Sequence, residues 1–280
     1  MTHDFKLVDV FGREDFSGNP LAVIAEAEDL DTDAMQSITR WLNLSETCFL
    51  LPPTMAGADY RVRIFTLQRE LPFAGHPTLG TCHAWLEAGG RPADPKRIVQ
   101  ECGVGLVPLR RNGDSLAFAA PPLVRSGPVD EADLVDAAEV LRIPREAIVD
   151  AEWIDNGPGW LGIMLDSAEA VLALDPVGSH RRRVDIGVIG PHQEGAEIAF
   201  EIRVFFSNHL GAIIEDPVTG SLNASAAQWL FASGRAKDAY VAAQGTAIGR
   251  TGRIFVDRDE GGEIWIGGKT RTLFEGTAAF

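Results

Sequence analysis

The sequence predicts an α+β protein made of two similar, β-rich domains that arose by internal duplication. The first observation is a repeat with an offset of 140 residues, which joins Arg63 to Arg203, Phe65 to Phe205, His76 to Asp216, Pro77 to Pro217 and Gly80 to Gly220. The second is a set of short segments with period-two alternation, which is typical of strands. The third is a break at Pro121-Pro122. We therefore expect domains at residues 1–123 and 124–280, the last strand being free to return to the first domain.

Length and charge limit the partners of the chain. It has 280 residues, 45% of them hydrophobic, which is enough for well-developed cores. The net charge of −15 disfavours nucleic acid and anionic membranes as partners. The start lacks a basic and apolar leader, and no run approaches the roughly 18 apolar residues of a membrane span. We expect a cytoplasmic protein.

The three cysteines are odd in number and do not have metal-ligand spacing, so neither a disulfide framework nor a zinc site is expected. We interpret them as small buried residues. The sequence also lacks the glycine-rich nucleotide loops, the nucleophile elbow and the zinc-hydrolase motif. These absences disfavour ATP, dinucleotide and zinc-hydrolase chemistry.

The elements of the first half follow from local patterns. Strand patterns are followed by a helix pattern that begins at Asp33, and the alternation that starts at Tyr60 leads toward the turn at Gly75. The expected strands cover residues 5–10, 21–24, 47–51, 60–65, 105–109 and 116–120.

The second half repeats this outline. Residues 130–141 have the pattern of an amphipathic helix, and the stretch from Glu215 to Ser221 is a turn that leads into an apolar helix of small residues. Because this helix pattern stops at Gly234, we expect it to be about one turn longer than the helix that follows Gly75.

The repeated turns predict an anion site. The first turn of a helix presents unpaired N–H groups, so two such turns facing one cleft would bind a carboxylate. In the 140-residue register His76 corresponds to Asp216, and Thr81 corresponds to Ser221. An imidazole and a carboxylate in one site would permit acid/base chemistry. The alternative is that both residues serve only as turn and packing residues.

Glu46 is the other carboxyl group of interest. It lies between a helix pattern and an apolar strand. From its local sequence alone, a capping or surface glutamate is the simpler interpretation, because nothing nearby indicates catalysis.

Three motifs resemble those of the phenazine-biosynthesis PhzF-like family. They occur in the family's order and are Asn43-Leu44-Ser45-Glu46-Thr47, Glu70-Leu71-Pro72-Phe73-Ala74-Gly75-His76-Pro77-Thr78-Leu79-Gly80 and Glu215-Asp216-Pro217-Val218-Thr219-Gly220-Ser221. The segments at Asp9, at Gly18-Asn19-Pro20 and at Gln244-Gly245 also fit, so the resemblance covers nearly the whole chain. It implies the diaminopimelate-epimerase-like fold, in which each half is a sheet rolled around a central helix. A departure from the family pattern occurs at Gly249-Arg250-Thr251-Gly252, where relatives often have proline after the arginine.

The resemblance also implies roles for single residues. The reaction would be a proton transfer without a cofactor or metal, in which Glu46 removes a proton from carbon and returns it elsewhere. His76 and Asp216 would orient and polarise a small carboxylated substrate. Substrate-binding groups would lie at the two turns, at Gly75, Gly80, Thr81, Gly220 and Ser221. A homodimer is implied by the resemblance alone.

Three functions remain open. The leading hypothesis is an isomerase that shifts a proton or double bond. A racemase or epimerase of an amino acid or hydroxy acid would need a second proton donor opposite Glu46; neither turn offers the thiol that the family's epimerase cousins use, but His76 or Asp216 could serve. A binding protein for small acids, without catalysis, is the third.

Overall fold

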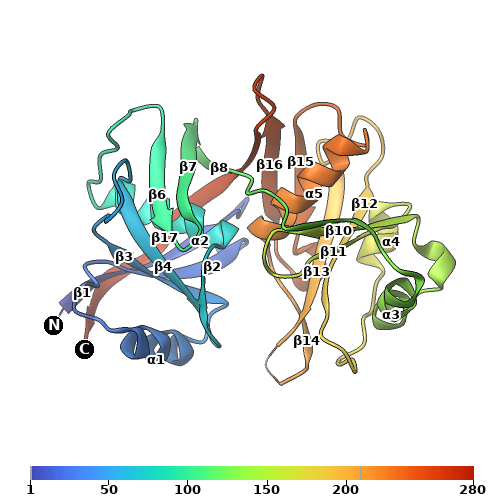
Figure 1. Ribbon diagram of the computed structural model, residues 1–280, viewed down its shortest axis with the longest axis horizontal. Helices are drawn as coiled ribbons and strands as arrows, with labels where there is room; N and C mark the ends of the chain where they lie inside the picture. Colours follow the sequence, from blue (N-terminus) through green and yellow to red (C-terminus); the bar gives the residue numbers. More distant parts are fainter. Residues whose placement is uncertain (1, 209) are drawn as a thin grey trace. The chain divides into compact units, whose positions relative to one another are not determined.

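A computed structural model describes residues 2–208 and 210–280 and divides the chain into two compact units (Figure 1). Unit 1 comprises Met1–Ala119 and Gly267–Phe280, and unit 2 comprises Ala120–Ile266. The sequence placed the boundary after residue 123, whereas the structure places it after Ala119 and returns the last fourteen residues to unit 1.

Unit 1 is a closed β-barrel. Its strands pair in the order β1-β2-β3-β4-β6-β7-β8-β17, and β17 pairs again with β1. A short strand, β5, pairs with β4 in the antiparallel direction. The bounds are β1 Thr2–Val10, β2 Asn19–Ile24, β3 Glu46–Leu51, β4 Tyr60–Thr66, β5 Glu70–Leu71, β6 Ile98–Cys102, β7 Gly105–Asn112, β8 Ser115–Ala119 and β17 Ile264–Ala279.

Helix α2 (Gly75–Glu87) lies inside this barrel, whereas α1 (Thr32–Leu42) packs outside against β3 and β4 (Figure 1). Strands on several sides contact α2, and nine of its residues are buried. Gly80 lies close to the barrel wall, because a Cβ atom there would lie 2.5 Å from Leu21 Cδ2 and 3.0 Å from Val10 Cγ2. The glycine therefore lets the helix pack against β1 and β2.

Unit 2 is a sheet with helices on both faces. Its strands pair in the order β9-β10-β11-β12-β13-β15-β16, with β14 added to β13. The strand bounds are β9 Arg125–Pro128, β10 Asp150–Asp155, β11 Leu161–Met164, β12 Asp185–Pro191, β13 Phe200–Ser207, β14 Ile213–Glu215, β15 Tyr240–Gln244 and β16 Gly252–Arg258. Its helices are α3 Glu131–Leu141, α4 Ala168–Leu172 and α5 Gly220–Ala232, with 3-10 turns at Arg145–Ala147 and Thr246–Ile248.

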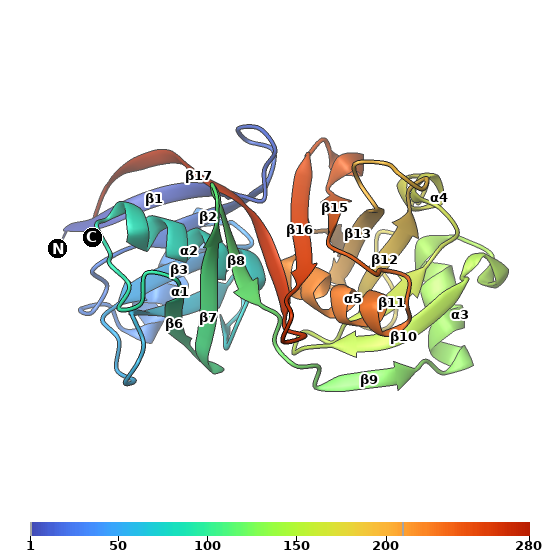
Figure 2. The same ribbon diagram turned by 90° about the horizontal axis from the view of Figure 1, so that it is seen from above.

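Helices α3 and α5 lie on opposite faces of β11 and β12 (Figure 2). Leu161 and Ile186 pack into the apolar cluster that contains the buried side chains of α3. Gly162 and Gly187 face the other way, where a Cβ atom on either would meet Trp229 or Leu222 of α5. Alternation along the strands thus separates the two helix layers.

The two units have the same order and connection of strands and helices, so the internal duplication is also visible in the structure. In each, two parallel strands are joined through a helix, β2-α1-β3 in unit 1 and β11-α4-β12 in unit 2. Each continues with an antiparallel strand, a short hairpin partner, a buried helix and a parallel return strand. The chain is therefore α+β, as expected.

The register of the repeat changes inside one hairpin, which corrects two expectations. Phe65 pairs with Glu70, whereas the equivalent Phe205 pairs with Glu215, so the second hairpin is five residues longer. From there on the offset is 145: α2 begins at Gly75 and α5 at Gly220, and both helices have 13 residues. The expected extra turn in the second helix is wrong.

The same shift changes which turn residues correspond. His76 is the second residue of α2 and corresponds to Ser221, the second residue of α5. Asp216 corresponds to Leu71, and the pairing of Thr81 with Ser221 is wrong for the same reason. The structural repeat is Glu-x-Pro-x-x-Gly, at residues 70–75 and 215–220.

Within residues 2–208 and 210–280, the helices are all too short or too polar to cross a membrane.

Candidate active site

Glu46 and His76 meet in unit 1. Glu46 is the first residue of β3, and His76 lies in the first turn of α2. The distance from Glu46 Oε2 to His76 Nε2 is 3.4 Å, and the two side chains are 16% and 5% exposed. The residues are 30 positions apart in sequence, and the packing of α2 inside the barrel brings them together. A carboxylate and an imidazole that lie next to each other at a partly buried position can act as proton acceptor and proton donor.

His76 is a neutral ring at physiological pH. Its burial lowers the pKa to about 3, because the charged form would lose its hydration. The contact with Glu46 is therefore not a salt bridge at neutral pH, although the distance would allow one. Asn19 Nδ2 lies 3.4 Å from His76 Nδ1. An amide nitrogen only donates, so this contact leaves the ring proton on Nε2, the ring nitrogen that lies 3.4 Å from Glu46 Oε2.

The buried neutral His76 predicts a pH dependence of stability. The unfolded chain takes up a proton near pH 6.5, whereas the folded chain does so only near 3, so folding releases a proton between these values. We expect the stability difference between wild type and His76→Gln to fall as the pH drops below 6.5, by up to about 1.4 kcal/mol per pH unit. Urea unfolding of both proteins between pH 7 and 5 measures this. A difference that does not change with pH would contradict a neutral His76.

The first turn of α2 keeps its N–H groups available. Its N-cap residue, Ala74, has no side chain that could cap the helix, whereas Asp31 caps α1 through the Ala34 N–H at 2.8 Å. The N–H groups of Gly75 and His76 therefore lie at an end of positive partial charge without a capping side chain.

Two predicted substrate-binding residues lie deeper in α2. Gly80 packs against β1 and β2, as described above. Thr81 is fully buried, and its hydroxyl donates to the carbonyl of Pro77 at 2.6 Å. The structure thus gives both residues a packing role within the barrel.

In unit 2, Asp216 is held in the turn before α5. Thr219 Oγ1 donates to Asp216 Oδ2 at 2.5 Å, and the N–H of Asp216 donates to the carbonyl of Val204 at 3.0 Å. Asp216 is 8% exposed. The turn is further fastened by Gln244 of β15, which donates to the carbonyl of Asp216 at 3.1 Å.

Ser221 is oriented by an aromatic donor. Trp160 Nε1 donates to Ser221 Oγ at 3.1 Å. Asn156 Nδ2 donates to the Ser221 carbonyl at 2.8 Å. Since the indole N–H can only donate, the Ser221 hydroxyl keeps its own proton for another acceptor. It sits beside the N–H groups of Gly220 and Leu222, at a helix start whose N-cap Thr219 makes no side-chain cap bond.

Sequence reasoning missed the partners that orient these groups. Asn19 and Gln244 belong to motifs noticed in the sequence, but their contacts with His76 and Asp216 were not foreseen. Trp160 lies outside the motifs named above. A buried polar side chain at the end of a strand was the available signal, because such groups must find hydrogen-bond partners.

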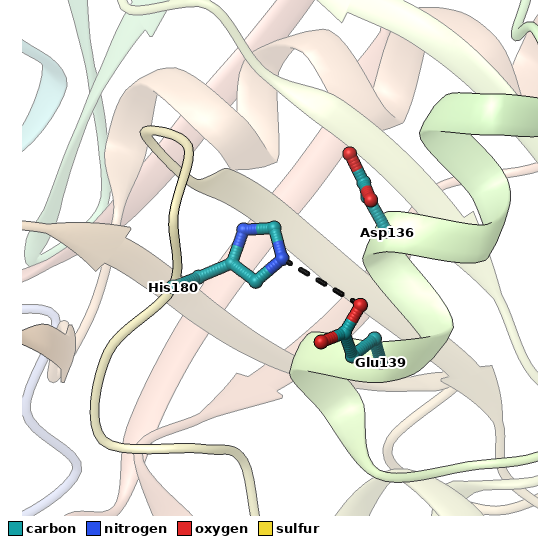
Figure 3. Close-up of side chains that lie close together, drawn as sticks. All are labelled: Asp136, Glu139 and His180. Atoms are coloured by element: carbon teal, nitrogen blue, oxygen red, sulfur yellow. Dashed lines mark ion pairs between the residues drawn. The ribbon is translucent and has the colours of Figure 1, made fainter.

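A second cluster of ionisable side chains lies elsewhere in unit 2 (Figure 3). Asp136 and Glu139 of α3 and His180 bring their ligand atoms within 4.8 Å of one another. Arg181 pairs with both carboxylates, and Arg182 Nη1 lies 2.8 Å from Asp136 Oδ2. Arg182 N–H also donates to His180 Nδ1 at 3.3 Å, whereas a metal on Nε2 would need the proton on Nδ1. The cluster is therefore a network of ion pairs that joins residues 180–182 to α3.

The fold and these groups define an epimerase-like α+β protein with the side chains for acid/base chemistry. The chain belongs to the phenazine biosynthesis-like protein family, whose PhzC-PhzF model matches residues 8–280.

Relatives support this assignment over the full length. A trans-2,3-dihydro-3-hydroxyanthranilate isomerase from Pseudomonas aeruginosa is 31% identical, with 99% of each chain covered. Antisense-enhancing sequence 1 from Schizosaccharomyces pombe is 34% identical, with 98% of each covered. The solved structure of a predicted epimerase from Pseudomonas aeruginosa matches with a TM-score of 0.79 at 28% identity over 99% of each chain. The family thus includes named isomerases that resemble this chain throughout.

Proposed function

We propose that the protein is a cofactor-independent isomerase that moves a proton, and with it a double bond, on a small carboxylated metabolite. Glu46 takes a proton from a carbon next to an activating group, and the electrons of that C–H bond form the new double bond. The electrons of the original double bond then form a C–H bond at a different carbon with the proton that Glu46 returns, so substrate and product are isomers. No oxidant or second substrate is needed.

The observation that carries this proposal is the contact between Glu46 and the neutral ring of His76. The uncharged ring does not form an ion pair with the Glu46 carboxylate, and a carboxylate beside a neutral imidazole can act as a proton acceptor. The Nε2–H of His76 supplies a neutral donor that can polarise a substrate oxygen. In unit 2, Asp216 would orient the substrate, and Ser221 with the first N–H groups of α5 would bind its carboxylate.

A screen of small carboxylic acids by thermal shift, followed by ¹H NMR in D₂O, tests the proposal. The first probe is trans-2,3-dihydro-3-hydroxyanthranilate, the probe acid from here on, because the Pseudomonas aeruginosa relative is named for it. We expect at least one stabilising acid to show a shifted double bond with hydrogen exchange. Acids that stabilise the protein yet never exchange hydrogen would instead support a binding protein.

A racemase is the second candidate, but it needs a second proton donor opposite Glu46, whereas His76 Nε2 lies only 3.4 Å from Glu46 Oε2. Its signature is inversion of a chiral acid without movement of a double bond. The low pKa of His76 favours the one-base isomerase, because a neutral imidazole with so low a pKa is seldom protonated at pH 7.

The proposed carboxylate contact of Ser221 gives a further prediction. Ser221→Ala should raise the KM for the probe acid about tenfold with a smaller change in kcat, because it removes a hydrogen bond to a charged group that is present before and during the reaction. Ser225→Ala is the matched control: its hydroxyl donates to the carbonyl of Ser221, one turn earlier in the same helix, at 3.1 Å. Equal KM values for the two variants would contradict the assignment.

A further inference from the structure

Gln244 makes four hydrogen bonds from a fully buried position on β15. Its Oε1 accepts from the Thr219 N–H at 3.0 Å and from Asn223 Nδ2 at 2.9 Å. Its Nε2 donates to the carbonyl of Asp216 at 3.1 Å and to Thr219 Oγ1 at 3.0 Å. A backbone donor and a backbone acceptor bind opposite ends of this amide, so its orientation is fixed.

This orientation dictates the direction of the next bond. The Thr219 hydroxyl receives a hydrogen bond from Gln244, and its single proton is donated to Asp216 Oδ2 at 2.5 Å. The three side chains form a one-way chain of donors that ends on the carboxylate. All three residues are buried, and neighbouring bonds in such a chain strengthen one another.

We propose that Gln244 and Thr219 are positioning residues that hold the Asp216 carboxylate as a fixed acceptor for the reaction. This inference rests on the proposed function in one respect only, the role of Asp216 toward substrate. The relay, residues Gln244, Thr219 and Asp216, restrains the rotation of the Asp216 side chain and gives its Oδ2 a defined donor.

Unit 1 offers an internal comparison. There Gln100 of β6 is also fully buried and bonds to hydroxyl groups of α2 and β4: it donates to Thr78 Oγ1 at 3.0 Å and accepts from Tyr60 Oη at 3.1 Å. A buried glutamine thus forms hydrogen bonds that hold α2 in unit 1 and the start of α5 in unit 2. In unit 2 this glutamine also directs a hydroxyl group toward a carboxylate.

NMR detection of the Thr219 hydroxyl proton tests the relay without a substrate. A buried hydroxyl in a short bond exchanges slowly, so we expect a downfield resonance in wild type and in Thr219→Ser. Thr219→Val should lose it, and Gln244→Met should shift it or speed its exchange. Gln100→Met is the control for general loosening and should leave the resonance in place. A resonance unaffected by Gln244→Met would overturn the relay.

Enzyme kinetics test whether the relay positions Asp216 for the reaction. With the probe acid, Thr219→Val and Gln244→Met should lower kcat about 10- to 100-fold, because displacement of a reacting or orienting group is costly. Thr219→Ser keeps the hydroxyl group and lacks the methyl group, so it should retain most of the rate. If only the packing of the methyl group mattered, Thr219→Ser would be as slow as a variant without the hydroxyl. Wild-type kcat in Thr219→Val would overturn the positioning role. A wild type that turns over no acid defeats the proposed function instead, while the hydroxyl resonance still decides the relay.

Discussion

Replacement of Glu46 by glutamine should abolish hydrogen exchange into the substrate while the protein stays folded. Glutamine has nearly the same shape but cannot accept the proton, so the loss is that of the acid/base group itself, about 100- to 10,000-fold in kcat. Binding of the probe acid should change little, because the proposed carboxylate contacts lie in α5. Exchange is measured by ¹H NMR in D₂O, and folding by circular dichroism and urea unfolding.

Glu275→Gln serves as the control for removing one negative charge from unit 1, since Glu275 is 77% exposed on β17. It should exchange hydrogen at the wild-type rate. Exchange that persists in Glu46→Gln would assign the proton to a different residue and would end the role proposed for Glu46.

The largest effect on stability is expected from Glu215→Gln. Arg203 and Glu215 form a bidentate pair, with Nε to Oε1 at 3.0 Å and Nη2 to Oε2 at 2.7 Å, and their side chains are 7% and 9% exposed. Removing the carboxylate leaves the guanidinium charge buried without its counter-ion. Such a change costs about 3–5 kcal/mol. Urea unfolding at pH 7 measures the loss.

The duplication provides a matched control in Glu70→Gln. Arg63 and Glu70 form the same bidentate pair in unit 1, but their side chains are 24% and 38% exposed. Water can solvate Arg63 after the change, so we expect a loss of at most about 1 kcal/mol. Equal losses in the two variants would show that burial does not decide the energy of this pair.

Local patterns predicted the individual elements well. The alternation along β4 is real: Tyr60, Val62 and Ile64 are at most 2% exposed. Helix α3 lies where the periodicity placed it. Trp41 falls on the apolar face that the three- and four-residue spacing predicts for α1 but is 84% exposed, because the helix turns Met35 and Thr39 toward the barrel instead. When a large apolar residue lies at the edge of the apolar stripe of a helix, the periodicity alone does not decide whether its side chain faces the core or the solvent.

Long-range closure could not be predicted from local patterns. The barrel of unit 1 closes through the pairing of β17 with β1, which joins the two ends of the chain. The repeat itself was visible, but a hairpin five residues longer in the second unit shifted its register. Sequence alone does not show where an insertion lies when short matches, such as Pro77 with Pro217, occur in the wrong register.

The candidate site was predicted in part. The motifs directed attention to Glu46, His76, Asp216 and Ser221, and the structure brings Glu46 and His76 together. It did not follow from the sequence that His76 would be buried and neutral, since this depends on packing inside the barrel. The orienting contacts of Trp160, which precedes β11, and of Gln244 in β15 join segments that are distant in sequence and required the fold.

The central claim is a one-base proton shift at Glu46, and the most direct measurement is the outcome of turnover in D₂O. The product of the probe acid, or of another acid that the screen identifies, is analysed by NMR for the position of the double bond, the deuterated carbon and the configuration of the remaining stereocentre. We predict a shifted double bond, deuterium only at the carbon that receives the proton, and an unchanged stereocentre. An inverted stereocentre with the double bond in its original place would contradict the account.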